Sequence, residues 1–543
     1  MSLILGAVGI ATLGNLFTPE NHLGYGPLST GIDLEDIWDV GGENRDAPAP
    51  ILEQLAIENW PVPEFGDARD RVEEARSLAL NLPVDRPLRI DISPYLGDMA
   101  KDFTTYTGTS DINSYTTQIS LNIAMWGYLQ NVFYSRTAPE SELGNTQSLN
   151  QAAKWFGTQY VFLHSDQDPI EIYQAAGWEL VDEAGKRQIW YNPNVPDFAT
   201  ATSRPAILVV GKPEVDAYMY MFRLANDGML PYEDALLVRG QPRIDRYELE
   251  TLQQFDALIL YGYDYKDSQK ARETIAAYVK AGGSVFVDTG WQYRIPEWEF
   301  EQAPSVLPVE SLTWTSYGMT DDYRVEAAEI AGDIDTSLFD SLVWQGAPWS
   351  VSGAEFDDVR DWGKVVLSAE GQPLVIAGEY GAGRVVWSGM NLPAHAWGNR
   401  NQEEVALLHN LLSWLTEGKE GVENPVTITR DHPDRVDFTL EVPNDDISWL
   451  YWREPVYPNW HAYLIEEGAR REIPIYRGGP GFMLMPIEGV SGDAHVELVW
   501  ETPIVERLAT GVSVLAFMAL GAFLIDGLFL GGNVHEGLAH RVK

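Results

Sequence analysis

An uncharged apolar run close to the C-terminus places the strongest constraint on how this chain folds. It extends from Leu508 to Ile525, and after Asp526 the apolar residues continue as GLFLGG. About 20 such residues, rising 1.5 Å each, cover the hydrocarbon core of a bilayer. The sequence therefore predicts a transmembrane helix over residues 508–530, and a buried core helix is the alternative.

The charges that flank this run predict its orientation. Arg507 precedes it, and the chain ends on Arg541 and Lys543. Basic residues favour the cytoplasmic side. We therefore expect a cell-membrane protein with a cytoplasmic tail over residues 531–543 and with its bulk outside the cytoplasm. Asp526 lies near the inner end, where an intramembrane carboxylate contacts a partner helix or reaches interfacial water.

A second apolar stretch lies at the N-terminus. Leu3–Phe17 spans about 22 Å as a helix and lacks the basic start of a signal peptide. Residues 1–17 are thus a candidate short membrane anchor, with an interfacial or buried helix as the alternative. Residues 18–85 are rich in proline, glycine and acidic side chains, which predicts an extended lead-in.

Composition excludes several classes of function. The formal charge is −43, from 80 acidic and 37 basic residues. Nucleic-acid binding requires clustered lysine and arginine, so a nucleic acid is not an expected partner. Cysteine is absent, which removes disulfides, thiolate nucleophiles and cysteine metal sites. The 19 tryptophans and 25 tyrosines favour packed domains over disorder.

The fold class that these patterns predict is multidomain α/β plus β. Residues 86–195 mix strand-like and helix-like segments, as in an α+β domain. Residues 204–418 alternate short apolar strands with amphipathic helices, which predicts a flavodoxin-like parallel sheet covered by helices. Within them, residues 373–391 form a predicted β-hairpin that turns at Gly381–Gly383. Residues 424–503 contain only strand-like segments and predict a C-terminal β-sandwich.

The C-terminal region resembles a known family of membrane proteins. Its motifs are Tyr457-Pro458-Asn459-Trp460-His461-Ala462-Tyr463, Ile473-Pro474-Ile475-Tyr476-Arg477 and Gly481-Phe482. They are similar to the β-sandwich that precedes the last helix in integral-membrane proteins related to GT-C glycosyltransferases. The resemblance covers the ectodomain and the closing helix. It implies a glycan-related envelope context without the transferase's multi-helix membrane part.

The middle block resembles class I glutamine-amidotransferase-like domains. The similar stretches are IAAYVKAGGSVFVDTG and GEYGAGRVVWSGMN, followed by NLLSWL. Such domains use a nucleophilic cysteine and a histidine after a late strand. This chain has no cysteine, and His395 lies slightly beyond Met390-Asn391-Leu392-Pro393. Thiol-dependent amidotransferase activity is therefore excluded, and no catalytic residue is assigned.

Candidate ligand-binding residues follow from the predicted sheet. Open α/β sheets bind ligands at the carboxyl ends of their strands. Asp288 and Glu379 are therefore predicted to line such a crevice, and Thr289 or Ser388 to lie at its strand ends. Aromatic side chains beside polar groups bind sugars or anchor protein interfaces, although core packing is their commonest fate. The aromatic candidates that we single out are Trp291 and Trp460.

No metal site is predicted, because the nine histidines are scattered. Calcium at acidic loops is the one cofactor left open, since hard cations prefer oxygen ligands. The loops concerned are Asp321-Asp322, Asp357-Asp358 and Asp445-Asp446.

Together these features predict a non-catalytic, membrane-anchored extracytoplasmic protein that binds or scaffolds a membrane or cell-envelope assembly. Its expected partners are the membrane, another membrane protein and a glycan. Two alternatives stay open at this point. One is the glycan-binding ectodomain of a split GT-C-type glycosyltransferase, and the other is a structural surface-layer component.

Overall fold

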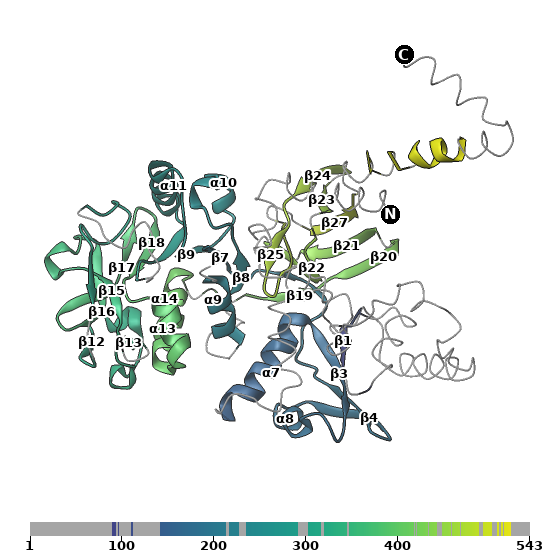
Figure 1. Cartoon of the computed structure of the whole chain (residues 1–543), viewed down its shortest axis with the longest axis horizontal. Coiled ribbons are helices and arrows are strands. Elements are labelled where there is room, and N and C mark those ends of the chain that lie inside the picture. The colour runs from purple at the N-terminus through teal and green to yellow at the C-terminus, as the bar shows by residue number, and fades with distance from the viewer. Residues whose placement is uncertain are drawn as a thin grey trace, which may run out of the picture.

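The computed structural model describes residues 89–93, 96, 110–111, 142–212, 217–226, 235–290, 302–316, 320–344, 347–417, 419, 421–432, 434–442, 448–457, 459–466, 468–487, 492–501, 508–509, 512–513 and 515–522. Figure 1 shows a helix-covered sheet at one end of the molecule, with a smaller mixed unit and a region of strands packed against it. The expected mixed α/β and β-rich architecture is confirmed.

Five parallel strands form the centre of the α/β domain. Their order is β8-β7-β9-β10-β18, which is the 2-1-3-4-5 order of flavodoxin-like sheets. Most of their residues are buried, because helices cover both faces of the sheet. The bounds are β7 Ala206–Val210, β8 Leu236–Arg239, β9 Ala257–Tyr261, β10 Ser284–Asp288 and β18 Gly383–Ser388.

The covering helices begin at polar caps. Asn401 accepts the backbone N–H of Glu404 at the start of α14, and Asp267 accepts that of Lys270 at the start of α11. Between β8 and β9 the chain forms two short helical pieces, because the backbone of Tyr247 is extended between them. The bounds are α9 Ala217–Asn226, η5 Ile244–Arg246, α10 Leu249–Leu252, α11 Ser268–Lys280, α13 Leu392–Asn399 and α14 Gln402–Leu415.

Antiparallel strands extend this sheet beyond β18. β17 (Gln372–Tyr380) pairs with β18 through a hairpin that places Tyr380 opposite Gly383, as the sequence predicts. β16 (Gly363–Ala369) and β12 (Tyr323–Val325) continue the sheet outward. Around them lie β11 Thr313–Ser316, β13 Val343–Trp344, β14 Ala347–Pro348, β15 Ser350–Gly353, α12 Ala328–Ala331, η6 Thr336–Leu338 and η7 Phe356–Asp358.

The first domain is a sheet of order β2-β1-β3-β5-β4. It packs on the α/β domain through α7, where the rings of Trp155 and Phe222 lie 5.0 Å apart between centroids. Both side chains belong to one hydrophobic core that spans the two domains. The bounds are β1 Arg89–Ile92, β2 Ser110–Asp111, α7 Glu142–Phe156, β3 Thr158–His164, α8 Ile170–Ala175, β4 Glu179–Ala184 and β5 Arg187–Tyr191.

The C-terminal strands form two sheets around a second core, which includes Phe438, Trp452 and Val496. One sheet, the outer sheet, has the order β20-β21-β27-β23-β24. Its strands are β20 Thr427–His432, β21 Arg435–Val442, β23 Trp460–Glu466, β24 Ala469–Ile473 and β27 Gly492–Trp500. The other contains β6 Ala199–Thr202, β19 Glu423–Pro425, β22 Trp449–Pro455, β25 Tyr476–Gly478 and β26 Phe482–Pro486.

The sheet that contains β6 is continuous with the α/β sheet. β25 pairs with β8 through Arg477↔Arg239, so thirteen described strands form one sheet. The sequence analysis treats the two regions as separate domains, and it assigns residues 196–203 to neither. In the structure β6 pairs with both β22 and β19. The backbone N–H of Ser203 also donates to the carbonyl of Val422. The chain thus enters and leaves the α/β domain through adjacent strands.

A buried arginine joins the first domain to the C-terminal strands, next to the point where the chain enters and leaves the α/β domain. The side chain of Arg453, on β22, is 0% exposed. Its guanidinium donates to the carbonyls of Lys154 and Asp197, to the Thr200 hydroxyl and to the Glu423 carboxylate. Because these acceptors lie at the end of α7, before and in β6, and in β19, one side chain fixes all of these segments.

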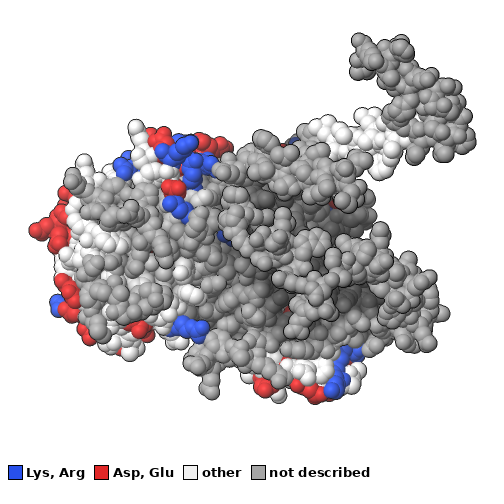
Figure 2. Space-filling view, viewed as in Figure 1, with Lys and Arg blue, Asp and Glu red and all other residues white. Residues whose placement is uncertain are grey.

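Charged side chains of the α/β domain lie on its surface, many in pairs of opposite sign. Figure 2 shows carboxylates at the left-hand edge of the molecule and a group of basic side chains at the top. Lys364 contacts Glu329 at 3.1 Å, and both side chains are more than 60% exposed. Exposed pairs of this kind contribute about 0–1 kcal/mol, so the buried contacts dominate stability.

Candidate functional site

Asp288 lies at the carboxyl end of β10, at the centre of the parallel sheet. Its carboxylate accepts the backbone N–H groups of Gly290 at 2.8 Å, Asn391 at 3.1 Å and Leu392 at 2.9 Å. The Ser388 hydroxyl donates to it as well. The residue is 0% exposed. The carboxylate therefore joins the end of β10 to the turn that follows β18.

Burial controls the protonation of this group. Loss of hydration raises the pKa of Asp288 to about 6, and the hydrogen bonds from Ser388 and the backbone N–H groups only partly oppose the rise. A raised carboxyl pKa is common in active sites, but it also occurs in structural networks. The carboxylate of Asp288 contacts Ser388 and neighbouring turns of the same domain, which matches a structural network.

Thr289, like Asp288, is fully buried. Its hydroxyl oxygen accepts the indole N–H of Trp387 at 2.8 Å, and its backbone N–H donates to the Ser388 carbonyl. Gly290 leaves no room beside it, because a Cβ there would lie 2.2 Å from the Asn391 nitrogen. The expectation that Asp288 and Thr289 line an open crevice is therefore wrong. The chain itself fills this edge of the sheet.

The role of Thr289 gives a first prediction. Thr289→Val is expected to lower the free energy of unfolding by about 1–3 kcal/mol, because it leaves the buried Trp387 N–H without its acceptor. Urea unfolding of the two proteins measures the difference. Thr289→Ser keeps the hydroxyl and is the matched control. A valine variant as stable as the serine variant would contradict a structural role for this hydroxyl.

Aromatic side chains cover the same edge, and the sequence analysis did not single them out. The Tyr261 hydroxyl donates to the side-chain carbonyl of Asn391, which adopts a left-handed conformation at φ 56°. The ring of Tyr220 contacts those of Tyr261 and Trp397 edge-to-face. The available signal was Asn391 itself, since asparagine is enriched in left-handed turns.

A buried acid–histidine pair lies next to this network. His395 Nδ1 and Glu404 Oε2 are 2.7 Å apart, and both side chains are 0% exposed. Burial raises the pKa of Glu404, and His395 opposes that rise. The other ring nitrogen of His395 lies 3.3 Å from the Ser341 carbonyl, and Trp349 covers the ring. The pair therefore joins α13 and α14 within the domain.

Glu379 lies at the amino ends of the parallel strands, whereas Asp288 lies at their carboxyl ends. β18 runs parallel to β10, so Ser388 lies beside Asp288, whereas β17 runs antiparallel and Glu379 pairs with Arg384. The expectation that Asp288 and Glu379 share one crevice is therefore wrong. The physical reason is the hairpin itself, which returns Glu379 to the amino ends of the parallel strands.

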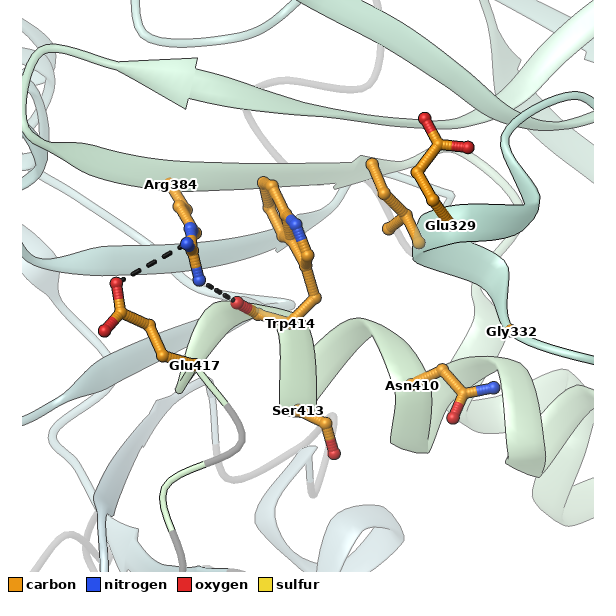
Figure 3. Close-up of a pocket in the computed structure, with 8 residues that line it drawn as sticks. Glu329, Gly332, Arg384, Asn410, Ser413, Trp414 and Glu417 are labelled. Carbon is orange, nitrogen blue, oxygen red and sulfur yellow. Dashed lines mark hydrogen bonds and ion pairs between the residues drawn. The ribbon is translucent and has the colours of Figure 1, made fainter.

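An open pocket of about 600 Å³ lies near those amino ends, between β18, α12 and α14 (Figure 3). Arg384 donates to the Trp414 carbonyl at 2.7 Å and pairs with Glu417 at 3.5 Å, as the dashed lines show. Asn410 donates to the Ala331 carbonyl. The side chains of Arg384, Glu417 and Asn410 already contact one another or the backbone. They therefore offer a ligand few free hydrogen-bonding groups.

Trp460 belongs to an aromatic cluster at one end of the outer sheet. Ring centroids of Trp460 and Trp500 are 5.5 Å apart, and those of Tyr457 and Trp500 are 6.3 Å apart. All three side chains are half-buried. Two other candidates, Trp291 and Asp526, lie outside the described residues.

The acidic loops engage neighbouring side chains. Asp322 pairs with Arg324, and Asp358 accepts the Ser311 hydroxyl. In the described ranges, no three histidine or acidic side chains lie close enough together to hold a metal ion. Asp445-Asp446 falls outside those ranges.

The described residues between 508 and 522 are helical, and they expose apolar side chains. The Ser513 hydroxyl donates to the Ala509 carbonyl, as within a helix. No helix within the described ranges is long and apolar enough to cross a membrane. In Figure 1 this helix projects away from the folded body. The exposed fractions run from 49% to 74% for Leu508, Val512, Leu515, Phe517, Met518 and Leu520.

Comparisons with known proteins give only distant likenesses. No family model and no curated protein matches the chain. Two cytoplasmic proteins from Salmonella typhimurium align at 15% and 17% identity with TM-scores of 0.26 and 0.28, over 39% of this chain and 98% and 99% of theirs. A ThuA-like protein from Bacteroides uniformis aligns at 12% identity and a TM-score of 0.27, over 41% of this chain and 95% of its own. Scores this low carry no argument about function.

Proposed function

We propose that this chain is a non-catalytic, membrane-anchored extracytoplasmic protein that serves as a binding or scaffolding subunit of a membrane or cell-envelope assembly. The observation that carries the proposal is that the described residues between 508 and 522 are helical and that their six large apolar side chains are at least 49% exposed. Exposed apolar surface of this kind marks a membrane or protein contact. The uncharged run continues to Ile525, so a bilayer is the occupant that best matches its length.

The packing of the α/β domain supports a role without catalysis. The chain lacks cysteine, and the strand end that carries Asp288 and Thr289 is closed by the chain's own turns. A nucleophile needs an accessible position beside a base. Neither residue has that access.

The continuity of the sheet supports a scaffolding role. Thirteen strands span the α/β domain and one layer of the β-sandwich, and one core joins the first domain to the second. Large shared cores oppose relative domain motion. The chain would therefore hold partner-binding surfaces at fixed positions relative to the membrane.

Membrane attachment is testable in the full-length chain. Replacing both Leu515 and Met518 by arginine is expected to move the protein from floating phosphatidylcholine vesicles into the aqueous fraction, because arginine is strongly disfavoured at the centre of a membrane helix. Leu515→Ile with Met518→Leu is the matched control and should still float. Urea unfolding of the folded body should be the same for both, since these side chains are exposed. Equal flotation of the two variants would contradict the proposal.

The absence of cysteine also allows a clean topology test. Ala469→Cys adds the only thiol, at an exposed position of the outer sheet. A membrane-impermeant maleimide should label it in intact cells. Labelling only after lysis would place the sandwich in the cytoplasm and contradict the proposal. Purification of the solubilised complex then tests for a companion membrane protein, and a solitary chain would argue against a scaffolding subunit.

A further inference from the structure

The aromatic cluster of Tyr457, Trp460 and Trp500 lies at the end of the outer sheet from which the chain leaves towards the exposed helix. Trp460 begins β23, Trp500 ends β27, and the two are paired in register. Trp500 is followed by seven residues before Leu508. Seven extended residues span at most about 25 Å, so this end of the sheet stays close to the start of the helix.

Backbone hydrogen bonds hold the cluster in place. The Trp460 N–H donates to the Tyr457 carbonyl, and the Glu501 N–H donates to the Asn459 carbonyl at 2.8 Å. The ring of Trp460 also packs on Trp452, with centroids 6.1 Å apart, and Trp452 is only 2% exposed. The three half-buried rings therefore form a rigid surface whose inner side belongs to the second core.

The outer sheet carries charged side chains at both ends: beside the aromatic cluster, Arg435 is 54% and Glu472 is 61% exposed. At the opposite end, β23 and β24 meet where Glu466 pairs with Ala469. There the side chains of Glu466, Arg470 and Arg471 are between 42% and 58% exposed. Tryptophan and tyrosine favour the boundary between water and hydrocarbon, because their rings are apolar with one polar edge. The end with the aromatic cluster thus suits the membrane surface, and the other, charged end, where the described residues form no such cluster, suits water.

We propose that the aromatic cluster is a second membrane contact, which rests in the headgroup layer of the leaflet that the C-terminal helix enters. This inference depends on the proposed membrane anchoring and deepens it, since it fixes which end of the β-sandwich faces the bilayer. Glu501 is exposed beside the cluster, so a zwitterionic lipid surface is a better match than an anionic one.

The test uses the full-length chain with a single cysteine in phosphatidylcholine vesicles. Asn459→Cys places an environment-sensitive fluorophore beside the cluster and leaves its three rings unchanged. Ala469→Cys places the same fluorophore at the charged end as the matched control. Lipids that carry a nitroxide near the headgroup are expected to quench the probe at 459 at least twofold more strongly than the probe at 469. Trp500→Ala should weaken quenching at 459 while flotation stays the same.

The two proposals fail in distinguishable ways. In one outcome, the protein floats with the vesicles while its two probes are both unquenched or equally quenched. That result would overturn the contact at the cluster and leave anchoring intact. Loss of flotation in the parent chain would contradict anchoring itself, and this inference with it. A probe at 459 that responds to soluble envelope polysaccharide but not to lipid would also overturn the membrane contact, in favour of a glycan site.

Discussion

Replacing Arg453 by methionine is expected to lower the free energy of unfolding by about 3–5 kcal/mol, the usual cost of removing one partner from a buried ion pair. Methionine fills a similar length but donates no hydrogen bonds. The change would leave two backbone carbonyls, of Lys154 and Asp197, without their buried donor. The Glu423 carboxylate would keep its 3.2 Å contact with Arg204, which limits the loss.

Urea unfolding followed by circular dichroism and by tryptophan fluorescence measures this loss. Because Arg453 joins the first domain to the C-terminal strands, both signals should shift together. Arg324→Met is the matched control, since Arg324 is 68% exposed and pairs with exposed Asp322. Its removal should cost about 0–1 kcal/mol. A loss of similar size in both variants would show that Arg453 does not join the regions energetically.

The stability that Asp288 contributes is expected to fall as the pH rises through about 6. Its pKa is about 6 in the folded protein, above the ordinary value of 3.8. The folded state therefore binds the proton more tightly than the unfolded chain. The contribution is fully present below pH 3.8 and is lost as the pH passes the folded pKa. A shift of about two units corresponds to about 3 kcal/mol in total.

Comparing the wild type with Asp288→Asn isolates this effect, because the other carboxyl groups titrate in both proteins. Between about pH 5 and about pH 7.5, the wild type should lose about 1 kcal/mol relative to the variant. Asp322→Asn, at an exposed carboxyl, is the control and should show no such trend. A difference that stays constant, or that grows with pH in favour of the wild type, would rule out a raised pKa at Asp288.

Local sequence patterns predicted the parts of the fold that depend on neighbouring residues. The hairpin of β17 and β18 follows from two apolar runs around Gly381–Gly383, and α14 follows from its apolar face. The pairing of β25 with β8 joins residues more than 200 positions apart. Nothing local specifies it, since an unpaired edge strand accepts many partners.

The errors at the candidate site also have physical causes. The predicted hairpin already required Glu379 to lie away from Asp288, because consecutive strands of a hairpin run in opposite directions. The closed edge around Asp288 was not visible in sequence, since it depends on Asn391 and Tyr261, 130 positions apart. Trp291, Trp460 and Asp526 stay predictions as ligand or partner contacts.

Because β6 pairs with β19, residues 203–422 form a segment whose two ends lie next to each other. Ser203 and Val422, the two end residues, are hydrogen-bonded to each other. A segment with adjacent ends can be added to a loop of an existing domain without separating the strands on either side. The α/β unit thus occupies the position of a loop between two paired strands, so its length can change without moving β6 relative to β19.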